Sequence, residues 1–138
     1  MESSLLLLFT AVVLVGGALL AVITFTRRPS RTLNQSKYRE KWLRITNEMD
    51  DKNHSSMAIA ILNADRLLDE ALRERGIAGD TLGERLTNSK TLFSDRQGVW
   101  DAHKLRNRIA HEEVKLNARR VHSAMKQFKT ALKDIGAL

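Results

Sequence analysis

The stretch MAIAILNADRLLDEALRERG, residues 57–76, decides the class of fold. Its apolar residues recur every three or four positions, as they do on one face of a helix: Met57, Ile61, Ala64, Leu68 and Leu72. The opening run, 57–62, would also suit a strand, but it continues without a break into helical periodicity. Ser55 or Ser56 can cap this segment, and Gly76 is a natural stop. We expect it to be the central core helix of a domain.

The segments on either side repeat the helical pattern. A first helix is predicted from Ser36 to about Asp50, and a short third helix begins after a Thr81–Glu84 capping box. Ser94 with Gln97 repeats that device before a fourth helix over 99–113, and a fifth runs over about 117–135. No alternating β pattern remains. The sequence therefore predicts an all-α protein, with a bundle of about five helices over residues 36–138.

The N-terminus has a different composition. Leu5 to Phe25 contains no charged residue, and as a helix its 21 residues would be about 31 Å long, which matches the core of a bilayer. Its ends lack the basic start and small-residue cleavage site of a signal peptide, so we expect an uncleaved single-pass anchor. The predicted organisation is an anchor over 1–26, a basic linker over 27–35 and a domain over 36–138. Arg27, Arg28 and Arg31 follow the span, which predicts a plasma-membrane protein with its N-terminus outside and its domain in the cytoplasm.

The remaining composition limits the partners. From Gln35 onward 20 Lys and Arg stand against 15 acids, a net charge of +5, which favours nucleic acid or anionic lipid as a partner. The absence of cysteine excludes disulfides and thiolate metal sites. His103 and His111 lie eight residues apart, about 12 Å along a helix, too far to hold one zinc ion together. We therefore expect neither a metal site nor a cofactor.

Two faces of the fourth predicted helix contain no Lys, Arg, Asp or Glu. Ala102, Leu105 and Ile109 suit the core of the domain. The other face has a mixed composition: Trp100, His103, Asn107, Ala110, His111 and Val114. Either more of the same domain or a partner must cover it. We expect Trp100, His103 and Val114 to form a homodimer interface.

The same helix carries residues suited to RNA cleavage. Attack by the 2′-hydroxyl requires proton transfer near neutral pH, which imidazole supplies, and a cation for the charge that grows on the phosphate. Arg106 and His111 supply these groups, but they point about 140° apart on a regular helix. Two helices that meet across a dimer axis could bring both groups to one phosphate.

The string LRNRIAHE, residues 105–112, resembles the signature of HEPN domains (higher eukaryotes and prokaryotes nucleotide-binding), in which Arg and a polar residue precede a spacer and His. The likeness extends loosely to the helical layout of 36–138. It implies metal-independent endoribonuclease activity at a dimer interface, with Arg106, Asn107 and His111 as the catalytic residues.

Other functions remain open. The last predicted helix has a basic face that is usual for solvated helices, but that could also bind an RNA backbone or the membrane surface: Arg119, Lys126, Lys129 and Lys133. Many HEPN proteins bind RNA or proteins without cutting. The alternatives are thus a non-catalytic adaptor, tethered to the membrane and recruiting RNA, an antitoxin-like protein or another protein, and a structural adaptor whose basic helix lies on lipid headgroups.

Overall fold

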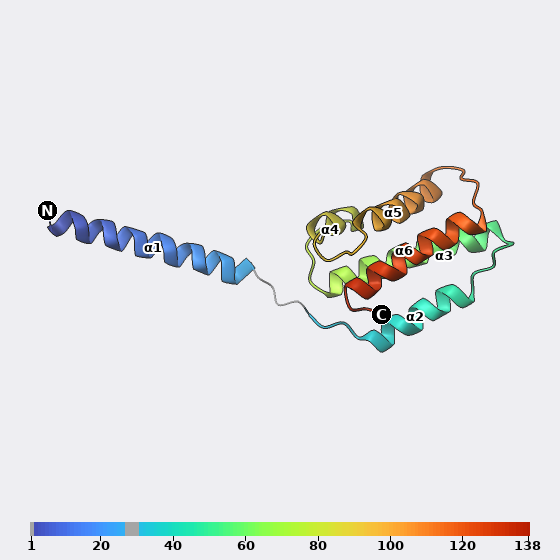
Figure 1. Ribbon diagram of the computed structural model, residues 1–138, viewed down its shortest axis with the longest axis horizontal. Helices are drawn as coiled ribbons and strands as arrows, with labels where there is room; N and C mark the ends of the chain where they lie inside the picture. The colour runs from blue at the N-terminus through green and yellow to red at the C-terminus, as the bar shows by residue number, and fades with distance from the viewer. Residues whose placement is uncertain (1, 27–30) are drawn as a thin grey trace. The chain divides into compact units, whose positions relative to one another are not determined.

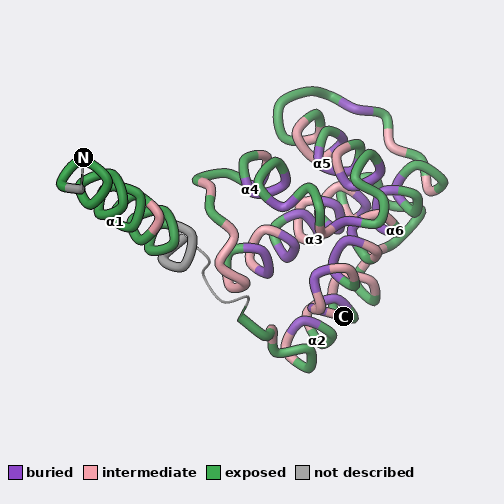
Figure 2. Tube along the Cα trace, turned by 60° about the vertical axis from the view of Figure 1, so that its left-hand side comes forward, coloured by how far each residue is buried: buried purple, intermediate pink, exposed green. Residues whose placement is uncertain are grey.

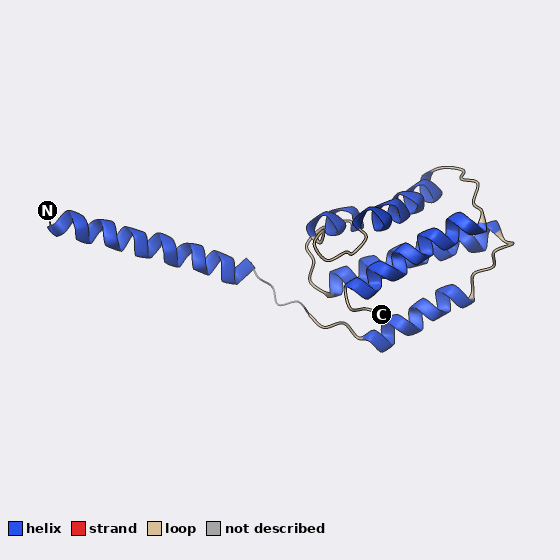
Figure 3. Ribbon diagram, in the orientation of Figure 1, coloured by secondary structure: helices blue, strands red, loops and turns tan. Residues whose placement is uncertain are grey.

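The computed structural model describes residues 2–26 and 31–138. Within these residues there are six helices and no strand, so the all-α prediction is confirmed (Figures 1 and 3). The chain divides into two compact units, of which the second, Arg31–Leu138, is here called the bundle. The predicted linker falls partly outside the described residues, since 27–30 are not described, and Gln35, its last predicted residue, already belongs to the next helix.

The N-terminal helix is long and apolar. Helix α1, Glu2–Thr26, contains a stretch, Ser3–Val22, with a mean hydropathy of 2.8, long and apolar enough to cross a membrane. Signal sequences share this length and composition. Thr10, a polar residue in this stretch, hydrogen-bonds through Oγ1 to the carbonyl oxygens of Leu6 and Leu7, at 3.0 and 2.9 Å. Its hydroxyl is therefore satisfied inside the helix, as a bilayer would require.

The bundle is built around one helix, α3. Its elements are α2 (Gln35–Asn47), α3 (His54–Glu74), α4 (Leu82–Asn88), α5 (Arg96–His111) and α6 (Ala118–Asp134). Helix α3 contacts all four others, and α5 also packs against α6. Figure 2 shows the buried positions gathered along the sides of these helices that face one another. Ile61, Leu68 and Leu72, from the stripe predicted for residues 57–72, are fully buried, as are Phe128 and Leu132 of α6.

Two helices of the bundle are capped by other residues than the sequence predicts. Asn53, rather than Ser55 or Ser56, caps α3, and its Oδ1 accepts a hydrogen bond from the Ser56 backbone at 3.0 Å. Asp95, rather than Ser94, caps α5. Ser94 instead donates to the carboxylate of Asp134. Asn, Asp and Ser are all good caps, so spacing alone could not choose between neighbours.

The Thr81–Glu84 cap of α4 forms only in part. Thr81 accepts from the Glu84 backbone at 3.2 Å as predicted, but the Glu84 carboxylate accepts from Asp80 rather than from Thr81. The helix ends at Asn88, and Phe93, whose spacing from Leu82 and Leu86 predicts a place on the same helix, is buried in the loop that follows it.

The end of α5 differs from its prediction. The helix was expected to run to Glu113, but Glu112 is extended (φ −137°, ψ 155°) and the helix ends at His111. Val114 therefore lies beyond the helix, and it is buried in the core of the bundle, where its carbonyl oxygen lies 2.8 Å from His54 Nε2. Its placement on a second face of the helix was wrong, and a side chain 8% exposed can offer little surface to another copy.

Polar side chains join α2 to α3. Tyr38, itself fully buried, donates its hydroxyl to Glu74 at 2.5 Å, and Lys37 binds the same carboxylate at 2.9 Å. Lys41 binds Glu70 at 2.8 Å. We call these five residues the α2–α3 clamp.

The clamp changes the acidity of its members. The hydrogen bond from Tyr38 lowers the pKa of Glu74, and hydrogen bonds to Glu74 and Glu70 raise the pKa of Lys37. Burial raises the pKa of Tyr38, and its bond to Glu74 raises it further. Burial alone would raise the pKa of Glu70, but the hydrogen bonds from Lys41 and Lys37 outweigh it and lower this pKa.

Candidate functional site

A cleft of about 580 Å³ lies where α3, the start of α4 and α5 meet. Its lining is polar: Asp65, Arg66 and Asp69 from α3, Thr81 to Gly83 at the start of α4, and His103, Arg106 and Asn107 from α5. Two of the three residues predicted to be catalytic, Arg106 and Asn107, thus lie in one cleft.

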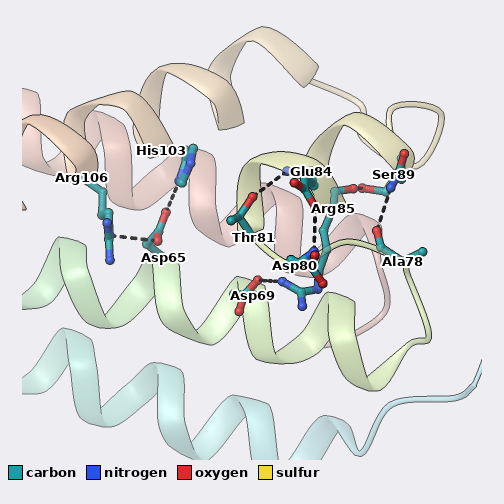
Figure 4. A network of polar contacts seen from close by, with 11 residues as sticks. Asp65, Asp69, Ala78, Asp80, Thr81, Glu84, Arg85, Ser89, His103 and Arg106 are labelled. Atoms are coloured by element: carbon teal, nitrogen blue, oxygen red, sulfur yellow. Dashed lines mark hydrogen bonds and ion pairs between the residues drawn. The ribbon is translucent and has the colours of Figure 1, made fainter.

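Asp65 is the central residue of this cleft. It is 5% exposed, and its Oδ1 lies 2.7 Å from His103 Nδ1. Its Oδ2 lies 3.2 Å from Arg106 Nε. Figure 4 shows the carboxylate of Asp65 between these two side chains of α5. The pairing neutralises one buried carboxylate with one guanidinium, which a buried charge requires.

Arg106 is held on one side and open on the other. Its Nη1 donates to Asn107 Oδ1 at 3.0 Å, while Nε faces Asp65 without forming a hydrogen bond. The side chain is 35% exposed, and among the described residues Nη2 has no hydrogen-bond partner. The open edge of the guanidinium could therefore bind a phosphate oxygen.

A second ion pair lies beside the first. Arg85 of α4 binds Asp69 at 2.7 Å, and its side chain is only 8% exposed (Figure 4). The Arg85 backbone carbonyl accepts from Ser89, a fully buried hydroxyl. The ion pair joins α4 to α3, and the bond from Ser89 closes the end of α4 itself, so the side of the cleft that α4 forms is attached to α3 by a largely buried ion pair.

His111 is not part of this cleft. It is exposed in the last turn of α5 and does not line the cavity, so within one chain the three predicted catalytic residues do not come together. It lies one helical turn beyond Asn107. A site that uses both Arg106 and His111 would therefore need a second copy of the chain.

The predicted interface residues have separate environments. His103 is buried against Asp65, and Trp100 is half-buried in a T-shaped contact with His103, the ring centroids being 6.0 Å apart. Val114 belongs to the core, as described above. Most of this predicted face is thus covered by the bundle itself, and exposed surface remains at Ala110 and His111.

The basic residues predicted to bind RNA lie on α6 or at its start. Arg119, Lys126, Lys129 and Lys133 are all exposed, and none forms an ion pair with a residue in the described part of the chain. Their positive charge is therefore available to an anionic partner. Among the described residues there is no cluster of three or more His, Asp or Glu side chains that could hold a metal ion.

Sequence reasoning missed Asp65. The residue lies four positions after Ile61 and three before Leu68, on the stripe that forms the core face of α3. An acid at such a position must find a buried partner, because an isolated buried carboxylate is costly. That position was the signal that could have identified it.

Comparisons of the chain with protein-family models, with curated proteins and with solved structures found no match.

Proposed function

We propose that the bundle is a HEPN-type domain directed at RNA, and that it acts as a metal-independent endoribonuclease where two copies pair through α5. The observation that carries the proposal is the position of Arg106, which is fixed by Asp65 and Asn107 and keeps one edge of its guanidinium open, while His111 is exposed in the last turn of the same helix. This combination offers a directed cation and an accessible imidazole on one helix.

The chemistry needs only groups of the chain. A His111 imidazole would take the proton of a 2′-hydroxyl while its oxygen bonds to the adjacent phosphorus. The bond to the 5′-oxygen then breaks, and that oxygen receives a proton, which the His111 of the other copy can supply. Arg106 would stabilise the charge on the phosphate oxygens. The products are a 2′,3′-cyclic phosphate and a 5′-hydroxyl.

The basic residues of α6 complete this proposal. Arg119, Lys126, Lys129 and Lys133 would hold the RNA backbone, with an affinity that falls as salt is raised.

We further propose that α1 anchors the bundle to the plasma membrane, with the N-terminus outside and the bundle in the cytoplasm. The arginines on which this orientation rests include Arg27 and Arg28, which lie outside the described residues.

The test uses the full chain in detergent or nanodiscs with mixed RNA, with and without EDTA. We expect fragments that end in cyclic phosphate, no effect of the chelator, and a loss of about 10²- to 10⁴-fold for His111→Ala, as is typical when a general acid or base is removed. Arg106→Lys keeps the charge but loses the planar fork, so it should also impair cleavage. The matched control is His122→Ala, since His122 is an exposed histidine whose ring contacts Asp51 and does not line the cleft. Wild-type protein that forms dimers but never cuts RNA would contradict the proposal.

A second function, a non-catalytic adaptor for RNA or for a protein partner, has its own supporting observation. In the bundle, the exposed large apolar side chains are Leu43 of α2 and Ile59 of α3. Ile59 lines a cavity of about 300 Å³ with Ile45 and Met49. Capture of a protein partner that Ile59→Glu abolishes, together with inactivity toward RNA, would favour this adaptor function.

A further inference from the structure

We propose that Asp65 and His103 are positioning residues, and that they fix Arg106 and Asn107 through a closed ring of four side chains that forms only while His103 is neutral. The proposal rests on the proposed function only in that it concerns the same cleft. The ring itself is a structural feature that can be tested without RNA.

The four side chains contact one another in a closed cycle. Asp65 Oδ1 lies 2.7 Å from His103 Nδ1, and His103 Nε2 lies 3.2 Å from Asn107 Nδ2. Asn107 Oδ1 lies 3.0 Å from Arg106 Nη1, and Arg106 Nε returns to Asp65 Oδ2 at 3.2 Å. Three of the residues lie on one side of α5, at spacings of one and four, while Asp65 closes the ring from α3.

Three of the four contacts are hydrogen bonds, and the fourth, between Arg106 Nε and Asp65, is an ion pair; the chemistry of the groups fixes the direction of each hydrogen bond. A carboxylate only accepts, so His103 Nδ1 must carry the proton that is donated to Asp65. A guanidinium only donates, so Asn107 must present its oxygen to Arg106. The amide nitrogen of Asn107 is then the donor toward His103 Nε2, which can accept only when it carries no proton. The ring therefore selects one tautomer of a neutral imidazole.

Protonation of His103 would open the ring. An N–H on Nε2 would face the N–H of Asn107, so the amide would have to turn and offer its oxygen to His103. Its nitrogen would then face Arg106 Nη1, donor against donor, and the guanidinium would lose the contact that directs its open edge. The charged groups that line the cleft around His103 are Asp65, Arg66 and Asp69 of α3 and Arg106 of α5, while α4 contributes none.

The first test is heteronuclear NMR of the ring and amide nitrogens of the full chain in micelles, with pH lowered from about 8 to about 5, the range in which histidines change charge. We expect a neutral His103 with its proton on Nδ1 at the upper end. As His103 gains a second proton, the side-chain signals of Asn107 and of Arg106 Nε should move with it. His122 serves as the internal control, because its contact with Asp51 is exposed and involves no such ring. A proton on Nε2 at the upper pH, or Asn107 signals that ignore the titration of His103, would overturn the proposal.

The second test is rescue by a conservative variant. Glutamine carries both a donor and an acceptor, so His103→Gln should preserve the chemical shifts of Arg106 Nε, whereas His103→Leu should shift them. In the RNA assay, His103→Leu should lower cleavage by about 10²-fold, the effect of misplacing a group by about 1 Å, and His103→Gln should restore most of it. Equal losses in both variants would overturn the positioning role. If the wild-type protein cuts no RNA, the proposed function fails, and the NMR result alone still decides whether the ring exists.

Discussion

Glu70 and Glu74 of α3 bind side chains of α2, whereas Asp65 and Asp69 bind side chains of α4 and α5. The two pairs of acids lie about 140° apart on one helix. The clamp to α2 uses flexible lysines with side chains 39% exposed. The opposite pair uses the forked guanidiniums of Arg85 and Arg106 and one imidazole, around carboxylates as little as 7% exposed. Lysine supplies charge without fixed direction, while planar groups impose a geometry. The comparison indicates that one side of α3 holds a neighbouring helix and the other orients a site.

Removing one acid from each side of α3 should show the largest difference between the two sides. Asp65→Ala should lower the free energy of unfolding by about 3 kcal/mol or more, because it leaves the half-buried charge of Arg106 without its partner. Glu70→Ala should lower it by at most about 1 kcal/mol, because water screens the lysines it binds. The measurement is urea denaturation of Arg31–Leu138, the unit that contains all the core residues of the bundle. Equal losses would mean that the two sides do not differ.

A smaller effect is expected for the one buried group of the clamp. Tyr38→Phe removes the hydroxyl that binds Glu74 and should lower the free energy of unfolding by about 1.5 to 3 kcal/mol, as is typical for a hydrogen bond to a charged group. Urea denaturation at neutral pH measures it, with Thr46→Val as the control for loss of a hydroxyl that bonds only within its own helix. No change on removing the Tyr38 hydroxyl would show that Lys37 alone satisfies Glu74.

The clamp should also respond to acid. The pKa of Glu74 is lowered in the folded state, so its contribution is present above the unfolded value of about 4.3 and is lost as pH falls through the folded value. The difference in stability between wild type and Tyr38→Phe should therefore shrink below about pH 4. A difference that stays constant as pH falls below about 4 would contradict the assigned bond, since the unfolded chain then takes up a proton that the bond from Tyr38 keeps off Glu74 in the folded protein.

The smallest expected effect is a difference between the two sides of α3 in how salt changes the stability cost of losing an acid. At about 1 M salt the screening length falls to about 3 Å, which weakens exposed ion pairs more than buried ones. The cost of Glu70→Ala should nearly vanish in salt, while that of Asp65→Ala should remain. Parallel urea titrations at low and high salt measure both. If high salt lowered the cost of Asp65→Ala by the same proportion as the cost of Glu70→Ala, the ion pair between Asp65 and Arg106 would be exposed to solvent.

The sequence predicted the elements better than the contacts between them. Apolar spacing located all five helices of the bundle, because each helix must bury one stripe. It misplaced the caps at Asn53 and Asp95, since several good capping residues adjoin each other there. It also extended α5 too far, because no glycine or proline marks the end at His111.

The candidate site was predicted only in its local part. Arg106 and Asn107 are adjacent in the chain, so their association follows from sequence. The pairing of His103 with Asp65 joins residues 38 positions apart and depends on how α5 packs on α3, which no spacing rule supplies. For the same reason the sequence grouped His103 with the interface residues, although it lies in the cleft with Arg106.

The proposed ribonuclease activity requires Arg106 of one copy and His111 of another to meet across paired α5 helices. The chain contains no cysteine, so a single introduced thiol reports one position. His111→Cys in the full chain in nanodiscs should form a disulfide-linked dimer rapidly under mild oxidation, while Lys126→Cys, exposed on α6, should not. Slow linkage at position 111, or equal linkage at both positions, would contradict a paired α5 site.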